Sequence, residues 1–302
     1  MGLTGIRRIR TAFIFAIILF ILMNSMTSCG RKSDEMIIVA GSTSVQPYAE
    51  ILSEAYSHIY PESEIDIQGG GSSAGVSAAL SGTAEIGMSS RTLKDSEIES
   101  LKDTGKQWYI VEIAKDGLAI IIHPDNLIKD LSLEQIRAIY AAEITNWREL
   151  GGKDAKIHVI TREEGSGTRS AFEELVMEKD FITPKAIVQD SNGAVRLLVS
   201  DDINSIGFIS LGLVQSEPGQ KPVKALYLNG INPTVENVRN GSYKLFRPFL
   251  FITVIEDGKE PDGLTKKFID YTVSPEGQEL LINEGLIPNM NTEDTEEFKE
   301  PE

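Results

Sequence analysis

Residues Ile157 to Phe172 read Ile-His-Val-Ile-Thr-Arg-Glu-Glu-Gly-Ser-Gly-Thr-Arg-Ser-Ala-Phe, and this stretch decides the fold. The apolar run at its start has the length of a short strand, Gly165-Ser166-Gly167 is a turn, and a helix is expected to open at Thr168. The first N–H groups of a helix have no acceptor inside it, and the helix dipole adds partial positive charge. Arg162 adds a planar fork that matches oxyanions. The pattern predicts a cradle for a tetrahedral oxyanion, with an ordinary capped helix as the alternative.

The same order of strand, hydroxyl-rich turn and helix recurs three times nearer the N-terminus. The three turns are Gly41-Ser42-Thr43-Ser44, Gly69-Gly70-Gly71-Ser72-Ser73 and Ser89-Ser90-Arg91-Thr92. Strands that alternate with helices at this spacing predict an α/β fold with a largely parallel sheet. Because the carboxyl ends of such strands meet at one edge, all these turns are expected to face one ligand.

Composition restricts the partners. The 302 residues are 41% hydrophobic and 25% charged, which is ordinary for a soluble globular protein. The chain has 29 Lys and Arg against 45 Asp and Glu, a formal net charge of −16. Nucleic acid is therefore not an expected partner, because it is bound through basic surfaces. A small anion would be repelled at long range and has to be held by local dipoles and hydrogen bonds.

The N-terminus is expected to be a targeting segment rather than part of the fold. Three arginines within residues 7–10 precede the apolar stretch 12–23, and small residues then lead to Cys29, the only cysteine. This arrangement resembles a bacterial lipoprotein signal. Residues 1–28 would be removed, and Cys29 would carry the lipid anchor.

Residues 29–35 would then form a polar tether. A retained membrane anchor is the alternative, because residues 11–30 carry no charge. Either way the globular part is expected outside the cytoplasmic membrane. With Cys29 used for the anchor, no thiol remains for a disulfide, a metal or catalysis.

The four turns together resemble the phosphate-binding proteins of high-affinity phosphate ABC transporters. The turn sequences come in that family's order and spacing, and Arg162-Glu163-Glu164-Gly165-Ser166-Gly167-Thr168 is the most specific of them. The resemblance covers nearly the whole chain after the signal. It implies a two-domain, periplasmic-binding-protein-like (type II) α/β fold, with mixed sheets flanked by helices and a two-strand hinge, that closes on one phosphate.

The rest of the chain fits two domains. Domain one would comprise residues 36–115 plus 248–288, and domain two residues 116–247. Two strand-like runs broken at Lys115-Asp116 mark the first crossover, and the run that begins at Arg247 marks the second. Residues 289–302 are acidic and poor in apolar side chains, which predicts a disordered tail.

The resemblance also implies the phosphate ligands, residue by residue. They are Thr43 through hydroxyl and N–H, Ser44 through N–H, Ser72 through both groups, Ser90, the Arg162 guanidinium, and the N–H groups of Ser166, Gly167 and Thr168 with one or two of their hydroxyls. Glu164 matches an acidic family position that would pair with the arginine and hold it in place.

Ser90 departs from the family pattern, in which many members have an aspartate at this position. A carboxylate there rejects fully deprotonated oxyanions such as sulfate, because it would face another acceptor with no proton between them. A serine hydroxyl donates or accepts, so selectivity against sulfate or arsenate stays open. Arg91, next in the chain, either reaches the ligand or pairs with an acidic residue.

Other chemistry has weaker support. Gly71-Ser72-Ser73-Ala74-Gly75 satisfies the serine-hydrolase motif, with Ser73 as nucleophile. Such an enzyme needs a downstream histidine, and His123 and His158 lie in or at strand-like runs where a structural role is expected. Gly69-Gly70-Gly71-Ser72-Ser73-Ala74 fits a loose dinucleotide fingerprint, but an exported protein would not meet a soluble nicotinamide cofactor. No cluster has metal-ligand spacing, so neither metal nor cofactor is expected.

The sequence therefore predicts a lipid-anchored, monomeric receptor that captures inorganic phosphate and presents it to an ABC-transporter permease, and no enzyme. Binding of another tetrahedral oxyanion, or a sensory role for the same site, is the alternative.

Overall fold

The computed structural model describes residues 35–215 and 219–288. The predictions for the signal peptide, Cys29 and the acidic tail lie outside these residues. Within them, no helix is long and apolar enough to span a membrane. The strands follow the order β2-β1-β3-β11-β4-β8-β6-β7, and β9 and β12 also pair with β4. A hydrophobic core forms at each end of this strand order. We call the half that contains β1, β2 and β3 lobe one and the half that contains β6, β7 and β8 lobe two.

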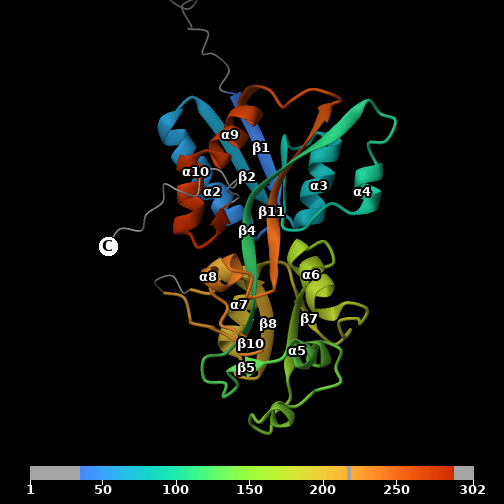
Figure 1. The fold of residues 1–302 in the computed structure, drawn as a ribbon, viewed down its shortest axis with the longest axis vertical. Coiled ribbons are helices and arrows are strands. Elements are labelled where there is room, and N and C mark those ends of the chain that lie inside the picture. Colours follow the sequence, from blue (N-terminus) through green and yellow to red (C-terminus); the bar gives the residue numbers. More distant parts are fainter. Residues whose placement is uncertain (1–34, 216–218, 289–302) are drawn as a thin grey trace, which may run out of the picture. The chain divides into compact units, whose positions relative to one another are not determined.

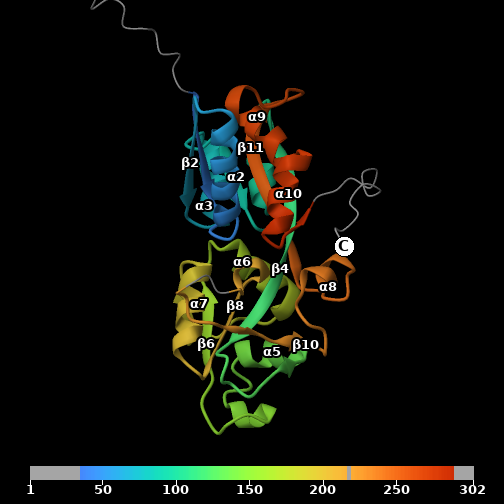
Figure 2. The ribbon, with the colours of Figure 1, turned by 90° about the vertical axis from the view of Figure 1, so that its left-hand side faces the viewer.

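Lobe one repeats strand and helix three times, as the turns predict (Figure 1). Its elements are β1 (Glu35–Gly41), α2 (Gln46–Ile59), β2 (Ser63–Gly69), α3 (Ser72–Ser81), β3 (Ile86–Ser89) and α4 (Asp95–Glu99), completed by α9 (Gly263–Val273) and α10 (Pro275–Asn283). β1 and β3 are parallel, while β11 runs antiparallel to β3, so the sheet is mixed. Helices α2, α9 and α10 lie together on one side of the sheet and α3 on the other (Figure 2).

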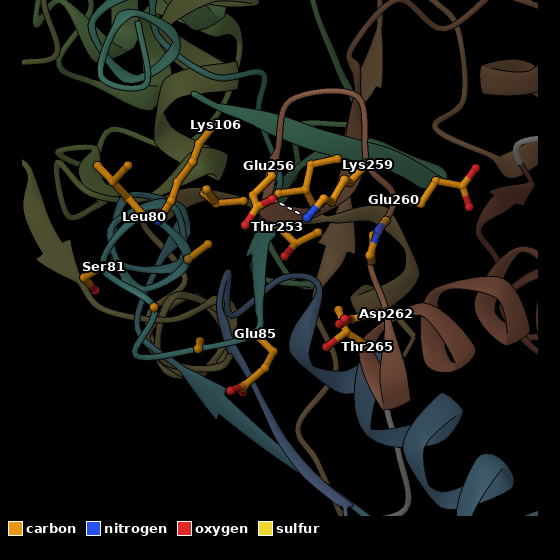
Figure 3. A pocket seen from close by; sticks show the side chains of 16 residues that line it. Leu80, Ser81, Glu85, Lys106, Thr253, Glu256, Lys259, Glu260, Asp262 and Thr265 are labelled. Carbon is orange, nitrogen blue, oxygen red and sulfur yellow. Dashed lines mark ion pairs between the residues drawn. The ribbon is translucent and has the colours of Figure 1, made fainter. Parts of the chain in front are cut away.

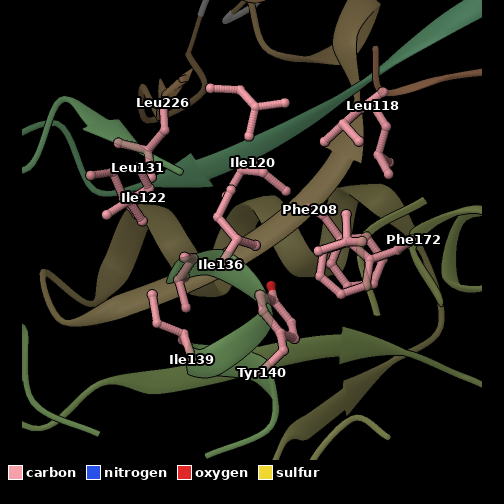
Figure 4. Close-up of a cluster of buried hydrophobic side chains, with 14 of the residues drawn as sticks. Leu118, Ile120, Ile122, Leu131, Ile136, Ile139, Tyr140, Phe172, Phe208 and Leu226 are labelled. Carbon is pink, nitrogen blue, oxygen red and sulfur yellow. The ribbon is translucent and has the colours of Figure 1, made fainter. Parts of the chain in front are cut away.

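Lobe two has the same design around a second core. Its elements are β5 (Asp130–Leu131), α5 (Leu133–Tyr140), a 3₁₀ turn (Trp147–Leu150), β6 (His158–Arg162), α6 (Gly167–Phe172) with a π-helical continuation (Glu173–Met177), β7 (Ile187–Gln189), α7 (Asn192–Asp201), β8 (Ser205–Ser210), a 3₁₀ turn (Leu211–Leu213), β9 (Lys224–Ala225), β10 (Tyr227–Leu228) and α8 (Val235–Arg239). In the core, the rings of Phe172 and Phe208 stack with their centroids 4.1 Å apart, and Tyr140 packs against both (Figure 4). This core fixes α6 and therefore the loop that precedes it.

Two long strands, β4 (Lys106–Ile122) and β11 (Phe246–Glu256), run through both lobes (Figure 1). The predicted break in the first strand at Lys115-Asp116 is wrong. These residues stay in β4 because Pro248 and Arg247 of β11 face them in an antiparallel ladder, and β12 (Ile287–Pro288) pairs with β4 on its other side. The paired strands form the predicted two-strand hinge, while the predicted domain boundaries stay a prediction.

Candidate anion-binding site

The predicted oxyanion loop joins β6 to α6 in lobe two. β6 ends at Arg162, and a turn is closed by the N–H of Ser166, which donates to the carbonyl of Glu163 at 3.1 Å. The Ser166 hydroxyl accepts from the N–H of Arg169 at 3.2 Å and so caps α6, leaving its own proton to donate elsewhere. Gly167 and Thr168 are the first residues of α6, whose opening N–H groups have no acceptor within a helix.

Lobe one contributes buried hydroxyls from three separate turns. Ser44 follows β1, Ser72 is the first residue of α3, and Ser90 follows β3; all three are at most 1% exposed. The hydroxyl of Ser90 accepts from that of Ser42 at 3.0 Å and lies 3.3 Å from that of Ser72. The Ser90 N–H donates to Ser72 at 3.0 Å. The turns therefore form one polar cluster, as their place at the strand ends predicts.

The two lobes meet through these groups. The hydroxyls of Ser44 and Thr168 lie 2.8 Å apart, and Nη2 of Arg162 donates to Oγ1 of Thr43 at 3.1 Å. A Cβ atom built on Gly167 would lie 2.2 Å from the hydroxyl of Ser72, closer than real Cβ contacts. The structure thus brings together every predicted ligand residue. One detail differs, because the Ser44 N–H donates to the Ser42 hydroxyl at 3.3 Å, so Ser44 faces lobe two through its hydroxyl.

Arg162 is the buried cation of the cluster, with 1% of its side chain exposed. Its Nε and Nη2 each donate to one oxygen of Glu163 at 2.9 Å, and Nη2 also donates to the carbonyl of Asp190 at 3.0 Å. Nη1 is buried and has no hydrogen-bond partner among the described residues. A buried charged donor without an acceptor costs more than about 1–3 kcal/mol, the penalty for a neutral group, so this atom is the natural contact for an anion.

The predicted pairing of Glu164 with Arg162 is wrong, because Glu163 makes this contact. The turn from Glu163 to Ser166 places Glu164 at its outer corner, where the side chain is exposed. Glu163 directly follows the strand, and its carboxylate folds back on the guanidinium.

Arg91 pairs with an acidic residue, one of its two predicted alternatives. Its Nη1 and Nη2 donate to the two carboxylate oxygens of Glu97 at 2.8 and 2.7 Å. Nη1 also donates to the carbonyl of Thr92, and Nη2 to the hydroxyl of Ser73. Burial tends to raise the pKa of Glu97, but hydrogen bonds from Arg91 and from the Lys94 N–H hold that pKa below its usual value. The Arg91 guanidinium thus donates hydrogen bonds to groups of lobe one.

Sequence reasoning missed three residues of the cluster: Ser42, Glu163 and Asn192. Asn192 is 2% exposed, begins α7 and donates from Nδ2 to the Ser44 hydroxyl at 2.8 Å. A signal was present, because Asp190-Ser191-Asn192-Gly193 is another polar turn between a strand and a helix. It has neither the arginine nor the glycine pair that mark the loop after β6.

The residues of the hydrolase alternative make other contacts. The Ser73 hydroxyl accepts from Arg91, and its N–H donates to the carbonyl of Gly165. The His158 ring lies 2.6 Å from the carboxylate of Asp202, in lobe two. The His123 ring accepts from the N–H of Asp125.

A hollow of about 420 Å³ lies elsewhere in lobe one, between the end of α3 and the turn after β11 (Figure 3). None of the predicted phosphate ligands lines it. Its lining carries four acidic side chains, Glu85, Glu256, Glu260 and Asp262, against Lys106 and Lys259, so the hollow does not suit an anion. Across residues 35–215 and 219–288, no group of three or more His, Cys, Asp or Glu side chains could hold a metal ion.

Two lobes, two strands that cross between them and a buried polar cluster where they meet define a two-lobe solute-binding protein. Residues 27–276 match the model of the PBP superfamily domain. The chain is 30% identical over 268 residues to the phosphate-binding protein PstS of Bacillus subtilis (strain 168), covering 88% of this chain and 85% of the relative. It is 31% identical over 281 residues to PstS of Borreliella burgdorferi, covering 90% and 97%. The chain therefore belongs to the PBP superfamily, in the family of the PstS phosphate-binding proteins.

Solved structures agree. A protein from Clostridium perfringens, assigned as a phosphate ABC transporter substrate-binding protein and solved with bound phosphate, is 42% identical with a TM-score of 0.76. The match covers 85% of this chain and all of that one. An ABC-type phosphate transport receptor from Vibrio cholerae is 38% identical with a TM-score of 0.66, over 83% of this chain and 99% of the other.

Proposed function

We propose that this protein is the extracytoplasmic substrate-binding protein of an ABC transporter and binds one inorganic phosphate between its lobes. One observation carries the proposal: the buried Nη1 of Arg162 has no acceptor within residues 35–215 and 219–288, and the arginine belongs to a cluster of hydroxyls supplied by both lobes. Relatives described as phosphate-binding proteins, and a 42% identical structure with bound phosphate, support phosphate as the anion.

The proposed phosphate ligands all lie in this cluster. They are Thr43, Ser44, Ser72, Ser90, Arg162, Ser166, Gly167 and Thr168. Arg162 supplies the positive charge, the start of α6 supplies N–H groups, and the serines and threonines supply hydroxyls. In a site shielded from water these neutral donors are effective despite the chain's net charge of −16.

The remaining features follow from this role. The protein would be a monomer without catalytic activity or cofactor, and it would pass phosphate to a membrane permease. A lipid on Cys29 would anchor it to the cell membrane, at the cell surface or in the periplasm. Residues 36–115 plus 248–288 and residues 116–247 would close on the ligand by bending at β4 and β11, because paired strands at a crossover bend with little strain.

Isothermal titration calorimetry of the full chain in mild detergent, after removal of carried-over anion, tests the proposal. Phosphate is expected to bind one to one with submicromolar affinity. Repeating the titration in millimolar sulfate measures selectivity. Binding of sulfate without binding of phosphate would keep the fold and overturn the substrate.

A further inference from the structure

Ser210, the last residue of β8, joins the hinge to the neighbourhood of the anion site. It is fully buried, and its hydroxyl donates to Oδ1 of Asp116 at 2.8 Å. The other oxygen of Asp116 accepts from Nε and Nη2 of Arg247 at 3.2 and 3.0 Å. Asp116 and Arg247 are register partners on β4 and β11 and are at most 2% exposed. The ion pair therefore fixes Ser210 against the two strands that connect the lobes.

The backbone of Ser210 fixes a second residue, Asn192. The Ser210 N–H donates to Oδ1 of Asn192 at 3.3 Å. A backbone N–H is only a donor, so the oxygen of the Asn192 amide has to face it and the NH₂ group has to face the other way. That NH₂ group points across the cleft and donates to the hydroxyl of Ser44, in lobe one, at 2.8 Å.

These hydrogen bonds continue to a hydroxyl at the start of α6. The Ser44 hydroxyl accepts from Asn192, and it lies 2.8 Å from the hydroxyl of Thr168. Either of these two hydroxyls can donate to the other, because Ser44 keeps a second lone pair and its own proton after it accepts from Asn192. In both arrangements one proton of the Ser44–Thr168 pair is left to donate to a bound anion.

We propose that Asn192 is a positioning residue: by donating to Ser44 across the closed lobes, it holds the Ser44–Thr168 pair together and leaves that pair one proton for the bound anion. The proposal rests on the proposed phosphate site and adds its regulation: closure at the hinge and donation at the anion are linked through Ser210 and Asn192. Nδ2 of Asn192, in lobe two, reaches Ser44 in lobe one, so this series of hydrogen bonds is complete only when the lobes touch.

Asn192→Asp reverses the hydrogen bond between residue 192 and Ser44 with almost no change in side-chain shape. One carboxylate oxygen still accepts from the Ser210 N–H, but the other accepts from Ser44 rather than donating to it. Thr168 then donates to Ser44 and turns a lone pair toward the anion. We expect phosphate affinity to fall about a hundredfold or more, and Asn192→Ala to lower it about five- to twentyfold, mainly through faster dissociation.

Asn237→Asp is the matched control. Asn237 also lies in the first turn of a helix of lobe two, and its Nδ2 donates to the carbonyl of Asn232, just before that helix. It adds the same charge to the same lobe without touching the chain of hydrogen bonds. Its phosphate affinity is expected to stay within about twofold of the unsubstituted protein.

A double-mutant cycle separates positioning from general destabilisation. If Asn192 acts through Ser44, then Asn192→Ala costs little more affinity once Ser44→Ala is present. Titration calorimetry and stopped-flow dissociation of phosphate, on the full chain, give both quantities. Additive losses, or Asn192→Asp binding phosphate as tightly as Asn237→Asp, would overturn the inference while the phosphate site stands. An unsubstituted chain that binds none of phosphate, arsenate and sulfate would overturn the proposed function and the inference together.

Discussion

The two lobes bring different chemistry to the same cluster. Lobe one offers neutral hydroxyls, and both terminal nitrogens of its nearby arginine, Arg91, donate to Glu97. Lobe two offers a helix start and Arg162, whose terminal Nη1 is buried and has no acceptor among the described residues. We infer different roles from this difference. Lobe two supplies the positive charge that binds the anion, and lobe one supplies the hydrogen-bonding groups that distinguish anions by their protons and shape. Substitutions in lobe two should therefore change affinity, and those in lobe one should change selectivity.

Among the substitutions that test this comparison of the lobes, the largest effect is expected from Arg162→Ala, which removes the charge contributed by lobe two. A hydrogen bond to a charged group contributes about 1.5–3 kcal/mol, so phosphate affinity should fall roughly ten- to 150-fold in titration calorimetry. Arg148→Ala is the control, because Arg148 pairs with Asp154 on the exposed surface of the same lobe. Unchanged affinity in Arg162→Ala would remove the loop after β6 from the site.

Gly167→Ala should have the next largest effect, because it blocks contact between the lobes. The added Cβ would lie 2.2 Å from the Ser72 hydroxyl and 2.5 Å from that of Ser90. The lobes have to stay slightly apart, and we expect roughly tenfold weaker phosphate binding. Gly193→Ala is the control, since the nearest atom to a Cβ there, the Ser191 hydroxyl, is 4.0 Å away. Equal affinities in the two variants would show that the lobes do not close this tightly on phosphate.

Ser90→Asp tests the role of lobe one in selectivity. A carboxylate accepts the proton of hydrogen phosphate but repels sulfate, so the concentration of sulfate needed to displace phosphate at neutral pH should rise several-fold. Ser77→Asp adds the same charge on the exposed side of α3 and should leave this concentration unchanged. The same sulfate competition in the Ser90→Asp variant and in the unsubstituted protein would disprove the assignment of selectivity to this position.

The smallest effect concerns the acid stability of lobe one. The pKa of Glu97 is lowered in the folded protein, so its pairing with Arg91 stabilises the fold above the unfolded pKa of about 4.3. This contribution is lost as the pH falls through the folded pKa. Urea unfolding at pH 7 should show a lower midpoint for Glu97→Gln than for the unsubstituted protein, and the difference should shrink at pH 3. A constant difference would mean that the charge of Glu97 is not involved.

The parts of the fold that depend on local sequence were predictable. The four hydroxyl-rich turns lie where strand runs give way to helical periodicity, and the structure has a strand before and a helix after each of them. Because the carboxyl ends of parallel strands meet at one edge of a sheet, these turns could be predicted to lie together without knowledge of tertiary contacts. Local hydrogen bonding and apolar periodicity decide these features, and both are visible in the sequence.

The remaining features depend on partners distant in the chain or on fine turn geometry. Lys115-Asp116 looked like a break because a polar pair interrupts an apolar run, but Arg247, 131 residues from Asp116, pairs with it across the hinge. Asn192 meets Ser44 across 148 residues. Glu163 and Glu164 are chemically identical neighbours, and only the turn decides which one folds back on Arg162. Periodicity and residue type carry no information on such choices.

A crystal structure of the full chain with phosphate bound would show which groups hold the anion. We expect one phosphate between the lobes, with an oxygen within hydrogen-bond distance of Nη1 of Arg162 and of hydroxyls from both lobes, among them Thr168 and Ser72. Phosphate held by one lobe alone, or bound away from Arg162, would contradict this expectation.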